Sequence, residues 1–173
     1  RDDPYRVDYT FVQRNSARYL GLAYSRLPLE LRQEVVNFAA REQRWLRDYA
    51  VFTCVKEDYE GLPWWEWPNE ALRRHEEEAI SAYITDQPDH VQFVYFCQWA
   101  FYRSWSETKQ AINDAGIKVF GDIPIYMDQD SCDIWSHQED YLLDKDLRPT
   151  VVAGVPPDYF AEDGQLWGNT IYD

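Results

Sequence analysis

The pattern of apolar and polar residues predicts a mainly helical first half of the chain. Apolar side chains recur at helical spacing from residue 5 to 24, and the candidates for burial there are Val7, Phe11, Val12, Tyr19, Leu20 and Ala23. Pro28 interrupts this pattern and suits the first turn of a second helix. From Leu29 to about Lys56 the same spacing continues, which predicts either one long helix or two shorter ones.

Residues 62–68, LPWWEWP, are predicted to form a loop in which two prolines bracket three tryptophans. Trp64, Trp65 and Trp67 have two interpretations: a platform that stacks on sugars, or a cluster that packs the loop onto the core. We favour packing, because indole rings contribute a large apolar area when they are buried. The charged segment 69–86 that follows is predicted to be a solvated helix with a small apolar side.

Helical spacing is strongest from Val91 to Ala115, and Gly116 is well placed to end that helix. Residues 117–120 then predict a short buried strand, so that helix, glycine and strand together form an α/β unit. Residues 126–173 are rich in proline and glycine and are predicted to be mostly a long loop. A loop of that length in a compact protein is usually functional.

Composition narrows the possible partners of the protein. The 173 residues suffice for one domain with its own core, and the net charge is −14 with 17% aromatic residues. Such a charge disfavours a broad cationic surface, so we expect neither nucleic acid nor a membrane as partner. Mean hydropathy is −0.63, and no apolar run approaches the roughly 20 residues of a membrane helix.

Motifs for metals, cofactors and nucleophiles are missing from the sequence. The three cysteines are widely spaced, and there is no Gly-rich phosphate loop, no G-x-S-x-G and no H-E-x-x-H. Asp128, Asp130 and Glu139 have part of a calcium-loop spacing, but Asp133 stands where such a loop requires glycine. We therefore expect no metal and no cofactor. Without a signal peptide or a disulfide framework, we interpret the chain as an excerpt of a longer cytoplasmic protein.

Two segments carry candidate chemistry. Asp122 follows the predicted strand 117–120, and polar residues at strand ends line the active sites of (β/α) barrels. A cap on the turn before Pro124 explains Asp122 equally well.

The second segment is residues 153–169, AGVPPDYFAEDGQLWGN. Its aromatic side chains, beside the amides of Gln165 and Asn169, match the apolar face and hydroxyl rim of a sugar. A surface loop packed by its own side chains is the alternative interpretation, and the residues leave both open.

The same residues resemble a known family. Val152–Phe160 and Gly164–Asn169 are similar to the signature loop of the 4-α-glucanotransferases, or amylomaltases, of glycoside hydrolase family 77. Gly121–Tyr126 with Asp130–Ser131 resembles that family's third-strand motif. Weaker similarities, such as Trp45–Ala50, lie in the predicted helices, and the resemblance spans nearly the whole chain in order.

The resemblance implies an α/β fold, namely part of a (β/α)₈ TIM barrel with an inserted, mainly helical subdomain. Residues 1–90 are expected to form the inserted helical subdomain. Residues 91–125 are expected to supply a helix and the third barrel strand, and residues 126–173 the loop region that covers the active site. A complete barrel needs about 250 residues, so this chain is expected to supply only a part.

The implied activity is transfer of α-1,4-glucan segments between maltodextrins by a retaining double displacement. The resemblance places the catalytic carboxylates beyond Asp173, so no residue of this chain is expected to be catalytic. It implies eight substrate-binding residues: Asp122, Asp130, Ser131, Tyr159, Phe160, Gln165, Trp167 and Asn169. Two alternatives remain, a non-catalytic α-glucan-binding protein and an α-glucan hydrolase of the same barrel clan.

Overall fold

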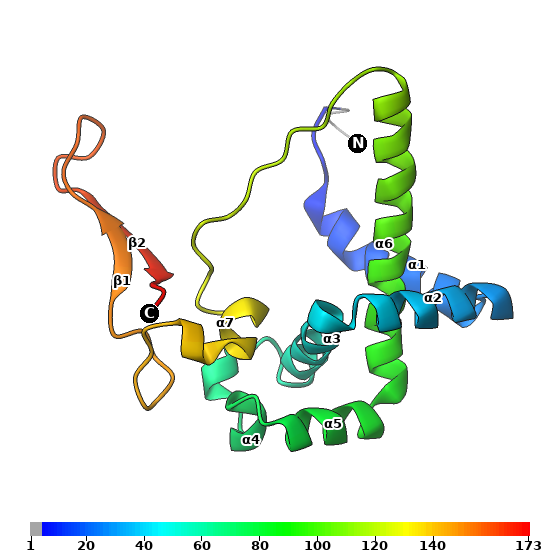
Figure 1. Cartoon of the computed structure of the whole chain (residues 1–173), viewed down its shortest axis with the longest axis horizontal. Coiled ribbons are helices and arrows are strands. Elements are labelled where there is room, and N and C mark those ends of the chain that lie inside the picture. Colours follow the sequence, from blue (N-terminus) through cyan, green and yellow to red (C-terminus); the bar gives the residue numbers. More distant parts are fainter. Residues whose placement is uncertain (1–4) are drawn as a thin grey trace.

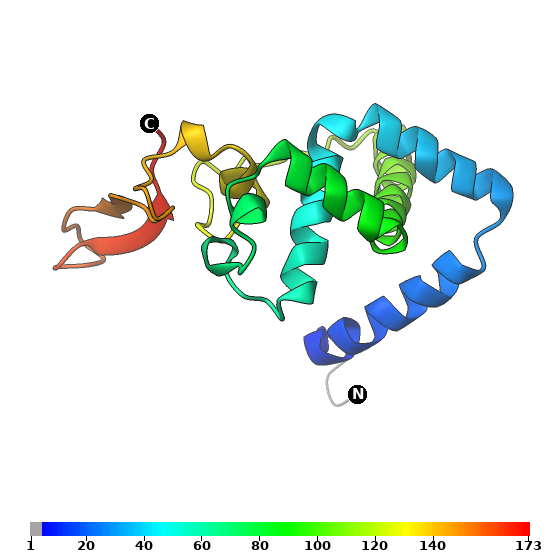
Figure 2. The same cartoon turned by 90° about the horizontal axis from the view of Figure 1, so that it is seen from below.

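Helices occupy most of the computed structural model, which describes residues 5–173, and a small hairpin lies at one end of it (Figures 1 and 2). The α-helices are α1 (Tyr9–Ser25), α2 (Leu29–Arg41), α3 (Gln43–Asp58), α4 (Glu70–Arg73), α5 (Glu77–Asp86), α6 (Pro88–Asp114) and α7 (Cys132–Ser136). Two 3₁₀ turns, η1 (Trp64–Glu66) and η2 (Gln138–Asp140), and two strands, β1 (Val152–Val155) and β2 (Gln165–Thr170), complete the order. Among the helices described, none is both long and apolar enough to cross a membrane.

The long helical pattern after Pro28 resolves into two helices, α2 and α3, which are separated at Glu42. Val35 and Phe38 are buried on α2, while Leu46, Ala50 and Cys54 are buried on α3. Both helices pack against the long helix α6. Of the two alternatives left by the sequence, two shorter helices is therefore the confirmed one.

The helix predicted within residues 5–24 forms as α1, but the predicted burial of its apolar residues is mostly wrong. Val7, Phe11, Val12 and Tyr19 are exposed among residues 5–173, and so is Ala23.

These residues are exposed because α1 packs against α6 near the C-terminal end of α1. There the ring of Tyr24 lies 5.6 Å from that of Phe93 and 5.4 Å from that of Phe96. Residues 1–4, the start of the predicted 1–90 subdomain, lie outside the described residues.

The core is built around three tryptophans, Trp64, Trp67 and Trp135, each with 0% exposure. Each indole nitrogen donates to a backbone carbonyl oxygen: Trp64 to Gln129 at 2.7 Å, Trp67 to Leu62 at 3.0 Å and Trp135 to Leu72 at 2.7 Å. Burial therefore leaves none of these polar groups unsatisfied, which is the condition for a stable tryptophan core. For Trp64 and Trp67, packing rather than a sugar platform is the confirmed interpretation.

The helix predicted from Val91 to Ala115 forms within α6, but its second half is mostly exposed. Gly116 follows α6 with φ +79°, as expected of a residue that ends a helix. Phe101 and Thr108, which follow the helical spacing of this segment, are both exposed. Val91, Val94 and Phe96 are the buried residues of this helix.

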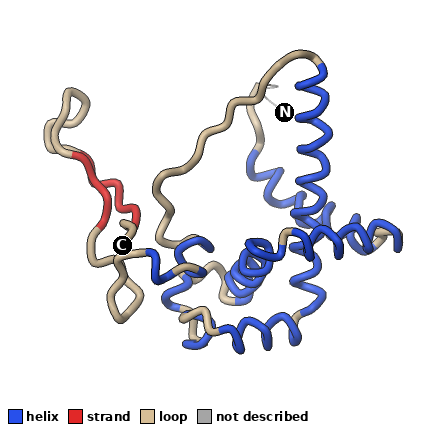
Figure 3. The backbone as a smooth tube through the Cα atoms, in the orientation of Figure 1, coloured by secondary structure: helices blue, strands red, loops and turns tan. Residues whose placement is uncertain are grey.

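The strand predicted at 117–120 does not form within the described residues. Residues 117–125 instead run as an extended segment without strand pairing, from the end of α6 towards α7 (Figure 3). Phe120 is 99% exposed. A strand forms only when its backbone groups pair with a neighbour, and no segment within 5–173 lies beside this one as a partner. The barrel part of the expected fold is accordingly not visible in residues 5–173.

The long loop predicted for residues 126–173 also needs correction, because it contains regular structure. It holds α7 and η2, and its last part forms an antiparallel hairpin of β1 and β2. The hairpin projects from the helical part (Figure 1). It carries the aromatic and amide side chains that the sequence analysis identified as suited to binding a sugar.

Candidate functional site

The hairpin of β1 and β2 contains an irregularity that shapes the candidate site. Val152 pairs with Thr170 and Gly154 pairs with Leu166, so a step of two residues on β1 faces four residues on β2. Gly168, with φ +80°, lies within this bulge. Bulges redirect side chains out of the regular alternation of a strand, and here the bulge contains Trp167 and Asn169.

Two glycines allow the strands to approach closely. A Cβ on Gly154 would lie 2.9 Å from the backbone oxygen of Gln165. A Cβ on Gly164 would lie 2.5 Å from the backbone oxygen of Val155, and Gly164 also has φ +75°. Both positions therefore exclude a side chain, since the obstacle in each case is backbone.

The tip of the hairpin holds two unpacked aromatic side chains on an ordered backbone. One carboxylate oxygen of Asp158 accepts hydrogen bonds from the backbone N–H groups of Phe160 and Ala161, both at 2.8 Å. Tyr159 and Phe160 are nevertheless fully exposed, at 105% and 93%. A loop packed by its own side chains does not describe these two residues.

The base of the hairpin contacts residues 125–127, where the extended segment 117–125 ends. The ring of Trp167 lies 6.3 Å from that of Tyr126 in an edge-to-face arrangement. The side-chain amide of Asn169 donates to the backbone oxygen of Met127 at 3.3 Å, and the Tyr172 hydroxyl donates to that of Ile125 at 3.1 Å.

Gln165 completes this group by accepting a hydrogen bond from the Trp167 indole at 3.0 Å. Three predicted site residues, Gln165, Trp167 and Asn169, therefore lie together. The sequence analysis did not include Tyr126 and Tyr172 among its candidates, although Tyr126 ends the Gly121–Tyr126 motif.

Asp130 and Ser131 instead contact the helical part of the protein. Asp130 forms an ion pair with Lys56 on α3, and its other carboxylate oxygen accepts from the backbone N–H of Trp64 at 3.3 Å. Ser131 caps α7 by accepting from the backbone N–H of Ile134 at 3.4 Å. These contacts fix the loop before α7 against η1 and α3.

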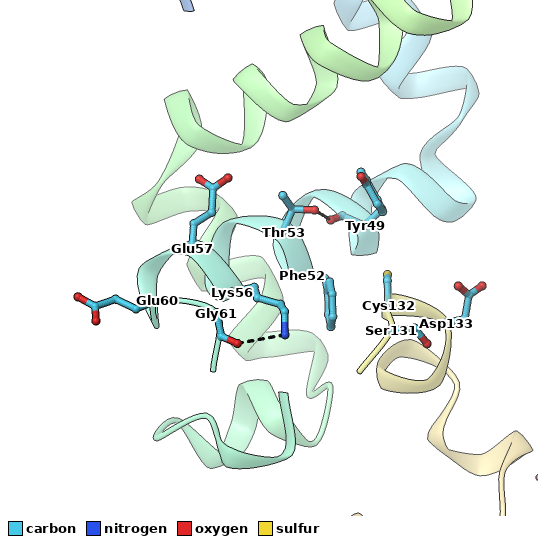
Figure 4. A pocket seen from close by; sticks show the side chains of 10 residues that line it. All are labelled: Tyr49, Phe52, Thr53, Lys56, Glu57, Glu60, Gly61, Ser131, Cys132 and Asp133. Atoms are coloured by element: carbon cyan, nitrogen blue, oxygen red, sulfur yellow. Dashed lines mark hydrogen bonds between the residues drawn. The ribbon is translucent and has the colours of Figure 1, made fainter. Parts of the chain in front are cut away.

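A hollow of about 680 Å³ lies between α3 and the start of α7 (Figure 4). Tyr49, Phe52, Lys56, Ser131 and Cys132 are among the residues that line it. Burial raises the pKa of the Cys132 thiol to about 12, helped by the nearby Asp133 and Asp48 carboxylates. The thiol therefore stays neutral at physiological pH, which makes it a poor nucleophile.

Asp122 lies apart from the other candidates. It is exposed, and its carboxylate accepts a hydrogen bond from the backbone N–H of Ile123 at 2.8 Å. This contact is local to the turn, and a role for Asp122 in substrate binding stays a prediction. In the described part of the chain, no group of three or more His, Cys, Asp or Glu side chains is placed to hold a metal ion.

Comparison with known proteins identifies the family of this chain. The family model described as 4-alpha-glucanotransferase, of glycoside hydrolase family 77, matches residues 1–173. The chain belongs to the 4-alpha-glucanotransferase family. The family predicted from the residues 121–131 and 152–169 is thereby confirmed.

Individual members of this family are similar over much of the chain. The 4-alpha-glucanotransferase of Thermus thermophilus is 46% identical over 143 residues, which are 83% of this chain and 28% of that protein. That of Clostridium butyricum is 35% identical and covers 99% of this chain, which matches 35% of its length.

A solved structure agrees with these relatives. The amylomaltase of Streptococcus agalactiae, solved in complex with acarbose, matches with a TM-score of 0.90 and 36% identity over 99% of this chain and 35% of that one. The chain thus spans about a third of the length of the relatives that it matches.

Proposed function

We propose that the protein is a 4-α-glucanotransferase that transfers α-1,4-glucan segments between maltodextrins by a retaining double displacement. The observation that carries the proposal is the match over residues 1–173 to this family, supported by the likeness to an amylomaltase solved with acarbose. In a double displacement, one carboxylate forms a glycosyl-enzyme and a second protonates the leaving oxygen. We place both carboxylates outside this chain, so its residues bind and position the glucan.

We further infer that the fold of the intact protein is a (β/α)₈ barrel with the helices of residues 1–90 inserted. In that arrangement, residues 117–120 gain strand neighbours, and the predicted third strand forms. The exposure of Phe120 supports this inference, because a buried barrel strand would cover a ring that is 99% exposed in residues 5–173. Asp122 then stands at the carboxyl end of a strand, where barrel enzymes bind substrate.

The hairpin supports a role in holding the glucan. Tyr159 and Phe160 are exposed at its tip, and Gln165, Trp167 and Asn169 follow along β2. Aromatic faces suit the apolar faces of glucose units, and amides both donate to and accept from hydroxyls. Closure of this hairpin over the site disfavours water as acceptor, which favours transfer over hydrolysis. We assign Asp130 and Ser131 to positioning of the loop that leads to α7.

The product profile of the intact protein given maltotriose tests the proposal. Glucose together with a ladder of maltodextrins longer than maltotriose is the expected result, because a sugar hydroxyl then replaces water as acceptor. Glucose and maltose without longer products would make the protein a hydrolase. No turnover with retained maltodextrin binding would make it a glucan-binding protein, and either result would reject the proposal.

A further inference from the structure

A cationic pocket of about 320 Å³ lies on the helical part, between α4 and the turn at residues 144–148. One wall comes from η1 and α4, and the other from the turn. The lining side chains are Trp65, Glu70, Arg73, Arg74, Lys145, Asp146, Leu147 and Arg148. None of them belongs to the candidate glucan site, which lies on the hairpin and the extended segment.

Hydrogen bonds fix the wall formed by α4. The side-chain amide of Asn69 accepts from the backbone N–H of Leu72 at 3.2 Å and so caps this short helix. The backbone oxygen of Leu72 accepts from the buried indole of Trp135 at 2.7 Å, and that of Arg73 accepts from the Gln138 amide at 2.7 Å. The backbone of Arg73 is therefore held against the core, and its guanidinium is not needed to hold α4 in place.

The opposite wall is equally well ordered. The carboxylate of Asp144 accepts from the backbone N–H groups of Asp146 at 2.8 Å and Arg148 at 3.0 Å, which closes the turn. Arg148 then bridges the two walls, since its guanidinium lies 5.0 Å from the Trp65 ring and donates to Glu66 at 2.8 Å. The pocket is thus preformed rather than a gap between mobile loops.

The charges in this pocket oppose those of the rest of the protein. Arg73, Arg74, Lys145 and Arg148 line it with only two carboxylates, although the chain as a whole carries a net charge of −14. Arg74 pairs with Glu70 at 3.0 Å. Arg73 and Lys145 form no ion pair within 4.0 Å among residues 5–173. Two cations are therefore available to an anionic ligand.

We propose that this pocket binds the phosphate monoester of a single hexose. Guanidinium and ammonium groups are the side chains that bind phosphate oxygens. The carboxylates of Glu70 and Asp146 can accept hydrogen bonds only, which suits the hydroxyls of a sugar and disfavours a bare phosphate. The volume is at the lower end of the range for small-molecule pockets, about 300 to 1,000 Å³, which favours a small ligand over a chain.

This inference does not depend on the proposed transferase activity, because the pocket and the hairpin share no residue. It adds a second ligand class to a protein whose predicted partner is an uncharged glucan. Nucleic acid is a poor candidate for the same pocket, since a chain with a net charge of −14 repels a polyanion.

Calorimetric titration of the intact protein at low salt, with glucose 6-phosphate, inorganic phosphate and glucose as separate ligands, tests the proposal. We expect the ester to bind most tightly, phosphate more weakly and glucose not measurably, with affinity for the ester falling as salt is added. Equal affinity for phosphate and the ester would reject the sugar part of the proposal. No binding of the ester at millimolar concentration would reject it altogether.

Variants decide whether this pocket is the place of binding. Lys145→Gln removes an exposed cation that forms no ion pair. It should weaken binding of the ester by about tenfold, the effect of one lost charge-assisted hydrogen bond. Arg73→Lys keeps the charge but removes the planar fork and should also weaken binding. Lys109→Gln, on the exposed end of α6, is the control and should change nothing. If all three variants bound the ester as tightly as the unsubstituted protein does, the ester would bind elsewhere and the assignment would be overturned.

Discussion

The tryptophan core and the hairpin use aromatic side chains in opposite ways. Trp64, Trp67 and Trp135 are fully buried, and each indole nitrogen has a backbone acceptor. Tyr159 and Phe160 lie on a backbone braced by Asp158, yet their rings are fully exposed. Burial of such a ring contributes roughly 1.5–3 kcal/mol, a stabilisation that the hairpin tip leaves unrealised in residues 5–173.

This difference separates residues that hold the fold from residues that await a partner. An exposed aromatic on a mobile loop carries little information, because solvent exposure is then the default. An exposed pair on a backbone fixed by hydrogen bonds and glycines indicates a binding surface. Substitutions in the helical part should therefore change the free energy of unfolding. Substitutions at the hairpin tip should change glucan binding and transfer instead.

The largest effect on stability is expected for Trp135→Ala. The substitution removes a fully buried ring and its hydrogen bond to Leu72, and should cost about 3–5 kcal/mol in the free energy of unfolding. Trp105→Ala, at a ring that is 41% exposed on α6, is the control and should cost less than about 1 kcal/mol. Urea-induced unfolding of both variants measures the difference, and equal losses would contradict the described core.

Gly164→Ala should be the most damaging change in the hairpin. The new Cβ would lie 2.5 Å from a backbone oxygen at a residue with φ +75°, so the strands must separate. Gly168→Ala is the matched control, since Gly168 has φ +80° but no atom lies within 4 Å of the added carbon. This substitution should cost only the strain of the left-handed conformation, roughly 1–2 kcal/mol.

Amide hydrogen exchange in Gln165–Thr170 distinguishes these two glycine variants. Protection of these amides should fall clearly more in Gly164→Ala than in Gly168→Ala. A hairpin that is equally protected in both variants would show that the close approach at Gly164 does not exist.

A smaller effect is expected at the ion pair that holds the loop before α7 against α3. Asp130→Asn breaks the ion pair with Lys56 but keeps an acceptor for the Trp64 backbone N–H. Because both side chains are about a quarter exposed, solvent screens the pair, and a coupling of about 1 kcal/mol is expected in a double-mutant cycle with Lys56→Met. A coupling near zero would mean that the loop before α7 is held by other contacts.

Periodicity predicted the helices well, because helical contacts are local and each turn satisfies its own backbone. It overestimated burial on α1, since apolar spacing does not say whether a partner is present. The strand predicted at 117–120 does not form in residues 5–173, because strand pairing requires a distant segment whose presence the local pattern does not show. Packing of Trp64 and Trp67 was predicted correctly from the clustering of large rings between prolines.

The candidate site shows the same division between local and distant information. The grouping of Gln165, Trp167 and Asn169 depends on a β-bulge at Gly168 and on contacts to residues 125–127. The sequence indicated the residues but not the bulge. The ion pair of Asp130 with Lys56, 74 positions earlier, was not foreseeable from spacing, and a role for Asp130 in substrate binding stays a prediction.

The most direct test of this account is Tyr159→Ala in the intact protein, with unfolding and product profile measured on the same sample. Because Tyr159 is fully exposed, the free energy of unfolding should change by no more than about 0.5 kcal/mol. The ratio of transfer to hydrolysis with maltotriose should fall, whereas Tyr19→Ala, at an exposed tyrosine on α1, should leave it unchanged. An unchanged ratio in Tyr159→Ala, or a large loss of stability, would contradict the assignment of the hairpin tip to glucan binding.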